Sequence, residues 1–319
     1  MVGLSTGQLA GLTTAQVDAM TSTQLASLST AQLSGFTSDQ IQAISLSDVG
    51  DLTTIQIDGF SAAQIGYFSA DQFSQLSTAQ LAAINTADVS GITTAQIAAL
   101  TGTRLAGLTT AQLNLLSATQ MQAFEAEDVA RLSTQQIQDL GTTQWRAMTT
   151  EQIAALRSSQ VAVIETRDLA VLNVDQLAAL QASQVDDLDT SQITALTPLQ
   201  ISQLSVATIV GITTGQIVAL TTAQWNKFTP EQIEVLTSRQ IQVMETQDLA
   251  ALSVSQIEGF TQLQLSYLTT EQIAAVPTSF IRAIVADRID GLTTAQIVAL
   301  TEAQAASGLN GDQVPYMTT

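Results

Sequence analysis

Residues 4–43 read LSTGQLAG LTTAQVDA MTSTQLAS LSTAQLSG FTSDQIQA, which are five consecutive variants of one eight-residue pattern. The same frame continues without an insertion to Leu300, so the sequence contains 38 octads with the consensus L-[TS]-T-A-Q-[IL]-A-A. Repetition at a short fixed period is typical of solenoid proteins, in which each unit buries its apolar face against its neighbours. We therefore predict one continuous repeat array over residues 1–319.

Each octad contains the signals of a helix start. Position 1 is always apolar, position 2 is mostly Thr or Ser, and position 5 is Gln in 29 of the 38 octads. A hydroxyl three residues before a Gln forms a capping box, and apolar residues at positions 1 and 6 form a hydrophobic staple. We therefore predict an all-α solenoid of very short capped helices, one helix per octad, with positions 1 and 6 inside.

Three further patterns support this register. Pro198 and Pro230 fall at position 3, the first helical position, where proline is favoured. Acidic residues gather at position 4, near the positive end of the helix dipole. Glycines recur at position 8, where a helix is expected to stop. Exceptions at position 2 include Pro277 and Val285, which cannot cap through a side chain, and the poor caps Arg157 and Gln181.

Two rival folds fit the pattern less well. In one continuous helix, each octad would rotate the apolar stripe by about 80°, and the stripe could not face one partner. A β-solenoid would show apolar residues at every second position, which the consensus lacks.

A longer period of five octads overlies the eight-residue repeat. Position 5 is Asp instead of Gln at Asp48, Asp88, Asp128, Asp168 and Asp248. We interpret this period as one superhelical turn of about five helices, which makes each turn a pentagon. The alternative is that a block of five octads is only the unit in which the gene was duplicated.

These five aspartates are the candidate site residues. Stacked carboxylates could bind Ca²⁺ together with surface carbonyl groups, but a helix-packing distance of about 10 Å between turns is too long for sharing one ion. We favour a structural role, in which Asp replaces Gln as the capping partner at position 5. A third interpretation is that Asp marks a corner or seam of the coil. We predict no catalytic residue, no bound metal and no cofactor.

Composition excludes several function classes. The chain has no Cys and no His, which removes disulfides, thiol catalysis and the commonest general base. The net charge of −19 argues against nucleic acid as a partner. No apolar stretch approaches the roughly 18 residues of a membrane span, so we expect no membrane insertion.

The end of the chain departs from the octad frame. The step from Leu300 to Leu309 is nine positions, which places a frame slip near residues 305–308, before a partial repeat that reads LNGDQVPY. The chain begins and ends within the pattern, and we expect it to be a fragment of a longer array.

The stretches ITTAQIAAL at Ile92–Leu100 and LTTAQIVAL at Leu292–Leu300, each an octad and the first residue of the next, resemble repeats of very long bacterial secreted or cell-surface proteins of adhesin type. The resemblance implies a stalk or spacer role. We expect a non-enzymatic, rigid rod of a bacterial extracellular or cell-surface protein, and end-to-end or lateral self-association is a further expectation. An alternative is a solenoid module that binds a protein or glycan partner. A further alternative is ice binding through Thr arrays, although the hydroxyls at position 2 are already committed to capping.

Overall fold

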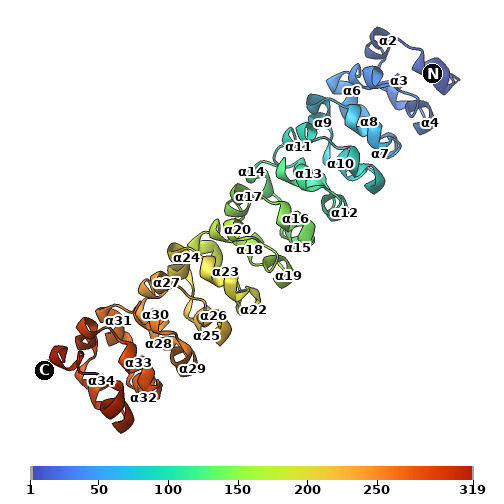
Figure 1. Cartoon of the computed structure of the whole chain (residues 1–319). Coiled ribbons are helices and arrows are strands. Elements are labelled where there is room, and N and C mark those ends of the chain that lie inside the picture. The colour runs from blue at the N-terminus through green and yellow to red at the C-terminus, as the bar shows by residue number, and fades with distance from the viewer. Residues whose placement is uncertain (1–2, 318–319) are drawn as a thin grey trace. The chain divides into compact units, whose positions relative to one another are not determined.

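The protein, described for residues 3–317 by a computed structural model, consists of short helices joined by tight corners (Figure 1). Within that range no residue is in a β-strand, and no helix is longer than six residues. The predicted all-α solenoid of short helices is therefore confirmed. Both rival interpretations, a β-solenoid and one continuous helix, are wrong.

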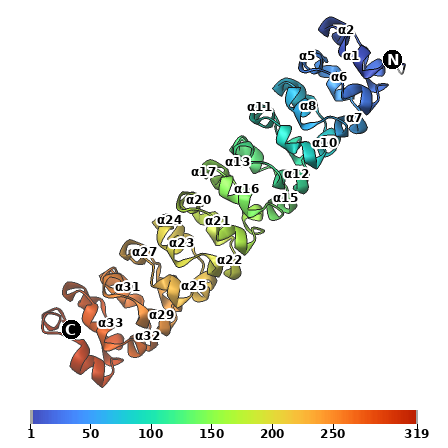
Figure 2. The ribbon, with the colours of Figure 1, turned by 45° about the vertical axis from the view of Figure 1, so that its right-hand side comes forward.

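The chain divides into two compact units, Met1–Val163 and Ile164–Thr319. Within each unit the helices follow the octads in order and wind through successive turns of a coil (Figures 1 and 2). The helices of the first unit are α1 Thr6–Ala10, α2 Thr14–Asp18, α3 Ser22–Ala26, α4 Thr30–Leu33, α5 Ser38–Gln42, α6 Leu46–Asp51, α7 Thr54–Asp58, α8 Ala62–Tyr67, α9 Ala70–Gln75, α10 Thr78–Ala82, η1 Thr86–Gly91, α11 Thr94–Ala98, η2 Leu105–Gly107, α12 Thr110–Asn114, α13 Ala118–Gln122, α14 Ala126–Val129, α15 Thr134–Gln138, α16 Thr142–Ala147, α17 Thr150–Ala154 and α18 Ser158–Val161.

The second unit is built in the same way. Its helices are α19 Thr166–Leu169, α20 Val174–Ala178, α21 Ala182–Asp186, α22 Thr190–Ala195, α23 Pro198–Gln203, α24 Val206–Gly211, α25 Thr214–Ala219, α26 Thr222–Trp225, α27 Pro230–Glu234, α28 Ser238–Val243, α29 Thr246–Ala251, α30 Val254–Ile257, α31 Gln262–Tyr267, α32 Thr270–Ala275, α33 Thr278–Ala283, η3 Ala286–Gly291, α34 Thr294–Val298, η4 Gln304–Gly308 and η5 Val314–Tyr316.

The local cause of most of the helices is the predicted capping box. In the octad that starts at Ile92, the N–H of Gln96 donates to Thr93 Oγ1 at 3.2 Å, and Gln96 Oε1 accepts from the N–H of Thr93 at 2.8 Å. Ile92 and Ile97, the staple residues, are buried. A helix of about five residues is too short to be stable alone, so packing against neighbouring turns must stabilise it.

The exceptional cap residues behave as predicted. Helices α23 and α27 begin at Pro198 and Pro230, the first helical position. Pro277 and Val285 form no side-chain cap. The poor cap Gln181 still donates its backbone N–H to Oε1 of the position-5 glutamine at 2.7 Å. One half of the capping box therefore survives where the cap side chain is unsuitable.

Apolar side chains at positions 1 and 6 form the interior of the coil, as predicted. The two largest, Trp145 and Trp225, are fully buried core residues. Trp225 stacks on Phe228, with ring centroids 4.4 Å apart. The continuous supply of apolar side chains along the coil gives each short helix the buried surface that it lacks alone.

The number of octads per turn is the main correction to the sequence prediction. Hydrogen bonds between turns join residues 28 to 31 positions apart, such as those from Gln40 to the carbonyl groups of Leu12 and Leu9. Helices three octads apart pack together, as α5 and α8 do. One turn therefore takes between three and four octads, and the predicted pentagon of five octads is wrong. Because each octad directs only two large apolar side chains inward, a ring of five would enclose more space than they fill at normal packing density.

The glycines at position 8 lie at helix ends, as predicted, but close approach between turns is what requires them. Gly11 is a C-cap with φ −83°, a conformation open to any residue. By contrast, a Cβ atom on Gly259 would lie 2.8 Å from the carbonyl oxygen of Pro230, the first residue of helix α27 in the preceding turn. Glycine at position 8 thus allows the backbones of adjacent turns to touch.

The predicted frame slip near residues 305–308 is a π-helical turn, η4. The N–H of Leu309 donates to the carbonyl of Gln304 at 3.2 Å, five positions earlier. A π-turn holds one residue more than an α-turn, so it absorbs the ninth residue of this repeat without breaking the coil.

Candidate functional site

The most regular polar feature of the interior is the side chain of the position-5 glutamine. Gln96 is fully buried, and its Nε2 donates to the carbonyl groups of Ile65 at 2.8 Å and Phe68 at 2.7 Å. Both acceptors belong to the preceding turn, whereas its Oε1 accepts from Thr93 in its own helix. One side chain therefore satisfies three backbone groups and joins two turns.

We call this series the glutamine ladder: position-5 glutamines whose Nε2 donates to the carbonyl groups 31 and 28 positions earlier. Its members include Gln40, Gln56, Gln64, Gln72, Gln80, Gln96, Gln112, Gln120, Gln152 and Gln160 in the first unit, and Gln200, Gln216, Gln224, Gln232, Gln240, Gln256, Gln264, Gln272, Gln296 and Gln304 in the second. After the π-turn, Gln313 continues the ladder at separations of 32 and 29 positions. The extra residue shifts the register of the ladder without interrupting it.

Sequence reasoning identified only half of the glutamine's role. The capping box explains the Oε1 contact, but a capping box accepts Glu as readily as Gln. Glu occurs at position 5 in none of the 38 octads. That absence was the available signal, because a carboxylate cannot donate a hydrogen bond to a carbonyl group.

Some residues that replace the ladder glutamine also donate to the preceding turn. Arg288 donates from Nη1 to the carbonyl groups of Glu258 at 2.6 Å and Phe260 at 2.8 Å. Thr208 Oγ1 donates to the carbonyl of Leu180 at 3.3 Å. The coil therefore tolerates different side chains at position 5 where they supply a donor.

The five candidate aspartates occupy two kinds of environment. Asp48 and Asp88 are partly exposed, and Asp48 Oδ2 accepts from the hydroxyl of Ser45 at 2.6 Å. Asp128, Asp168 and Asp248 are buried, with 4%, 0% and 1% of their surfaces exposed.

Two of the buried aspartates accept hydrogen bonds from the turn before their own. Asp128 Oδ1 accepts from the N–H of Gly102 at 3.0 Å, and Asp248 Oδ1 accepts from Thr222 Oγ1 at 2.6 Å. Both partners lie 26 positions earlier, at position 3 of their octads. In these two octads, Asp links adjacent turns as an acceptor, whereas Gln does so as a donor.

Asp168 differs from the others. Its two carboxylate oxygens have no hydrogen-bond partner among the described residues, and Arg167 Nε lies 3.6 Å from Oδ2. Burial raises the pKa of Asp168, an effect that the Arg167 charge opposes. Burial also raises the pKa of Asp248, against the hydrogen bond from Thr222.

Within each unit, the structure does not stack the candidate aspartates in a column. Since equivalent groups in adjacent turns are 28 to 31 positions apart, side chains five octads apart are displaced around the coil as well as along it. Within residues 3–317, no three acidic side chains are grouped closely enough to hold a metal ion.

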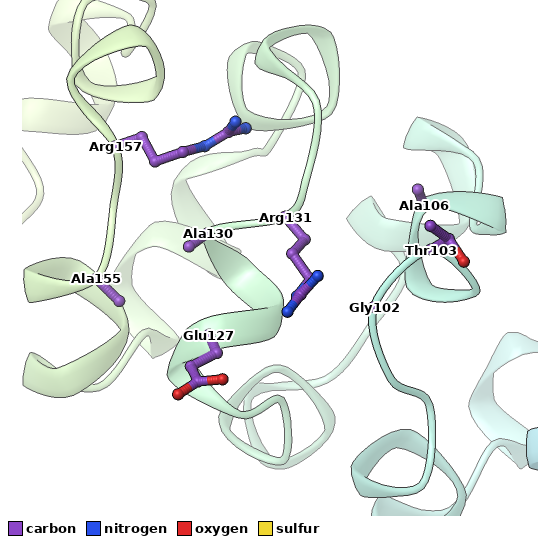
Figure 3. A pocket seen from close by; sticks show the side chains of 8 residues that line it. All are labelled: Gly102, Thr103, Ala106, Glu127, Ala130, Arg131, Ala155 and Arg157. Atoms are coloured by element: carbon purple, nitrogen blue, oxygen red, sulfur yellow. The ribbon is translucent and has the colours of Figure 1, made fainter.

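A surface pocket of about 600 Å³ lies beside octad 100–107, where a turn and the 3₁₀ helix η2 replace the α-helix (Figure 3). Gly102 has φ +55°, the only positive φ in the part of the chain that the structure describes. The pocket is lined by Gly102, Thr103, Ala106, Glu127, Ala130, Arg131, Ala155 and Arg157. Figure 3 shows the Arg131 side chain extending between the Gly102–Thr103 segment and Glu127.

The repeated capped helices and the glutamine ladder define the chain as a helical repeat protein. A family model described as the ALTTAQ repeat matches residues 1–30, 72–102, 121–158, 161–198 and 241–278, and the protein belongs to this family. Together these segments make up more than half of the sequence. The search of curated proteins found no match. Among the described helices, none combines the length and apolar character that crossing a lipid bilayer requires.

Proposed function

We propose that this array is a non-enzymatic structural element, a rigid rod or stalk that holds other parts of a longer protein at a distance. The observation that carries the proposal is the glutamine ladder. Each ladder glutamine makes the same two hydrogen bonds to the preceding turn, as Gln96 does to Ile65 and Phe68. A link that recurs along both units resists bending, which is the property that a spacer needs.

The hydrogen bonds of the buried ladder amides also support a structural role. The ladder amides are buried, and both ends of each amide are engaged with backbone groups. They are therefore not free for acid–base chemistry, and an amide does not titrate in the physiological range. Catalysis would need groups that this interior does not provide, and we propose that the array is not an enzyme.

We further propose that residues 1–319 form one continuous array in a bacterial extracellular or cell-surface protein. The octads run through both units in a single frame as far as Leu300. Support for the location comes from the resemblance to surface repeat proteins, from the absence of cysteine and from the net charge of −19, which favours solubility. Antibody labelling of intact producing cells tests the location, and labelling only after lysis would contradict it.

Small-angle X-ray scattering of the full chain tests the rod. With three to four octads per turn, 38 octads make about ten to thirteen turns. At a helix-packing distance of about 8–10 Å per turn, the particle should be roughly 80–130 Å long. Its radius of gyration should be about 30 Å, against about 20 Å for a compact domain of this length, and the smaller value would refute the rod.

A further inference from the structure

Three departures from the octad consensus meet at the pocket in Figure 3. Gly102 is the only glycine at position 3 of the 38 octads, and Arg157 is the only basic residue at position 2. Arg131 is one of only two basic residues at position 8. Because these residues come from different octads, the coil and not the sequence brings them together. Residues that depart from the consensus and lie together in an otherwise regular protein are typical of a functional site.

The loop that forms one side of the pocket is held in place. The N–H of Gly102 donates to the buried carboxylate of Asp128 at 3.0 Å, which ties the loop to helix α14 of the next turn. Helix α14 is followed directly by Ala130 and Arg131, which also line the pocket. The pocket is therefore a preformed feature, since this partly buried hydrogen bond fixes its two walls relative to each other.

The guanidinium group of Arg131 is available to a ligand. It is exposed and makes no hydrogen bond or ion pair within the described part of the chain. Arg157 donates from Nη2 to the carbonyl of Leu132 at 3.0 Å, which engages one of its nitrogens. A planar guanidinium with free N–H groups binds a carboxylate through two parallel hydrogen bonds.

The other residues that line the pocket favour the carboxylate of a sugar over that of a peptide. Gly102, Ala106, Ala130 and Ala155 project nothing beyond a methyl group, and no aromatic or large apolar side chain lines the pocket. It therefore lacks the apolar anchor that usually captures a peptide side chain. Thr103 and Glu127 add a hydroxyl and a carboxylate, which suit the hydroxyl groups of a sugar.

We propose that this pocket binds an acidic sugar residue, a hexuronic acid unit of a glycan, with the sugar carboxylate on Arg131 and its hydroxyl groups toward Thr103 and Glu127. The site goes beyond the structural role of the array and does not depend on it. A surface rod with such a site along its side would contact acidic polysaccharide while it spans a distance. Added salt would screen the attraction between Arg131 and the sugar carboxylate, and it would also screen the repulsion between the acidic protein and the acidic sugar. The test is therefore made at one fixed ionic strength.

Titration of the full chain with a galacturonic acid oligosaccharide, followed by NMR chemical shifts, tests the proposal. Saturable shifts are expected for backbone amides around Gly102 and Arg131. The neutral galactose oligosaccharide of the same length should bind at least tenfold more weakly. Arg131→Gln should weaken binding of the acidic sugar at least tenfold, because the amide cannot make the paired charged contact.

Arg239→Gln is the matched control, because Arg239 is also exposed but lies outside the pocket and loses the same charge. It should bind as the unsubstituted protein does, and circular dichroism should show unchanged helix content in both variants. Three results would overturn the proposal: no saturable binding, equal losses in the two variants, or equally tight binding of an acidic peptide.

Discussion

The side-chain amide of Gln96 donates a 2.7 Å hydrogen bond to the carbonyl oxygen of Phe68, a residue 28 positions earlier in the chain. Both residues are buried, so water cannot replace this bond. The same relationship recurs along both units and sets the spacing between turns. The stability of the array should therefore depend on a donor at position 5, and not on capping alone.

Gln96→Glu tests that dependence. The carboxylate can still accept from the N–H of Thr93, but it cannot donate to Ile65 or Phe68 and would place its charge against their carbonyl oxygens. We expect a loss of about 2–4 kcal/mol in the free energy of unfolding, measured by urea denaturation. Gln16→Glu is the control, since Gln16 is exposed and makes the same capping box. Similar losses in the two variants would contradict the role of the ladder.

Gly259→Ala tests the close approach between turns. Its new Cβ would lie 2.8 Å from the carbonyl oxygen and 2.9 Å from the Cα atom of Pro230, so the two turns must separate. We expect a destabilisation of about 1–3 kcal/mol, seen as a lower thermal midpoint. Gly11→Ala should be neutral or stabilising, because a Cβ there would meet only its own helix, at 3.5 Å or more. If Gly11→Ala proved equally harmful, the glycines would serve the helix end and not the contact between turns.

The buried aspartates predict a pH dependence of stability. Burial raises the pKa of Asp248 in the folded chain, and Glu245, the N-cap residue of the same helix, raises it further, whereas the Thr222 hydroxyl opposes both. Of the helices that pack against α29, α26 has no charged residue and α32 has Glu271. A carboxyl group whose pKa is raised by folding stabilises the folded chain in its protonated form. This contribution is complete below the pKa of the group in the unfolded chain, about 4, and is lost as the pH rises through the pKa of the group in the folded chain.

Asp248→Asn isolates this contribution, because Asn is neutral at every pH and its side-chain oxygen can still accept from Thr222. We expect the variant to be more stable than the unsubstituted protein at pH 7, with the difference shrinking toward pH 4. Thermal unfolding across that range measures the difference. Glu231→Gln should show the opposite trend, since hydrogen bonds lower the pKa of the exposed Glu231. A difference between Asp248→Asn and the unsubstituted protein that stays constant with pH would disprove the assignment.

Arg288 provides a fourth test, because it replaces the ladder glutamine with a different donor. Arg288→Ala removes hydrogen bonds to Glu258 and Phe260 and should cost about 0.5–1.5 kcal/mol in urea denaturation. Arg288→Gln restores the consensus donor and should retain most of the stability. Equal losses in the two variants would indicate that Arg288 acts through its charge or its packing.

The sequence predicted the local structure well because the signals are short-range. Thr93 and Gln96 are three positions apart, and their reciprocal hydrogen bonds form within a single helical turn. The π-turn at η4 was likewise visible as a nine-residue step in an eight-residue frame. Such features depend on backbone geometry that neighbouring residues determine.

The candidate site was less accessible to sequence reasoning. Asp48, Asp88, Asp128, Asp168 and Asp248 were found by their spacing, but the partners of Asp128 and Asp248 lie in another turn and are not evident from the octad frame. Asp128 binds Gly102 of another turn, and nothing near Asp128 in the sequence indicates that partner. Arg157 was recognised as a poor cap, but its position beside Arg131 at one pocket follows only from the coil.

By itself the sequence therefore determined the helix, its start, its end and its buried face, since these follow from contacts within one octad. Only the tertiary structure decided how many octads make a turn, and with it the second role of Gln96 and the need for Gly259. The physical reason is that the turn closes where interior side chains reach normal packing density and the position-5 amide reaches two carbonyl groups. Both conditions join residues 28 to 31 positions apart, beyond the reach of any pattern within one octad.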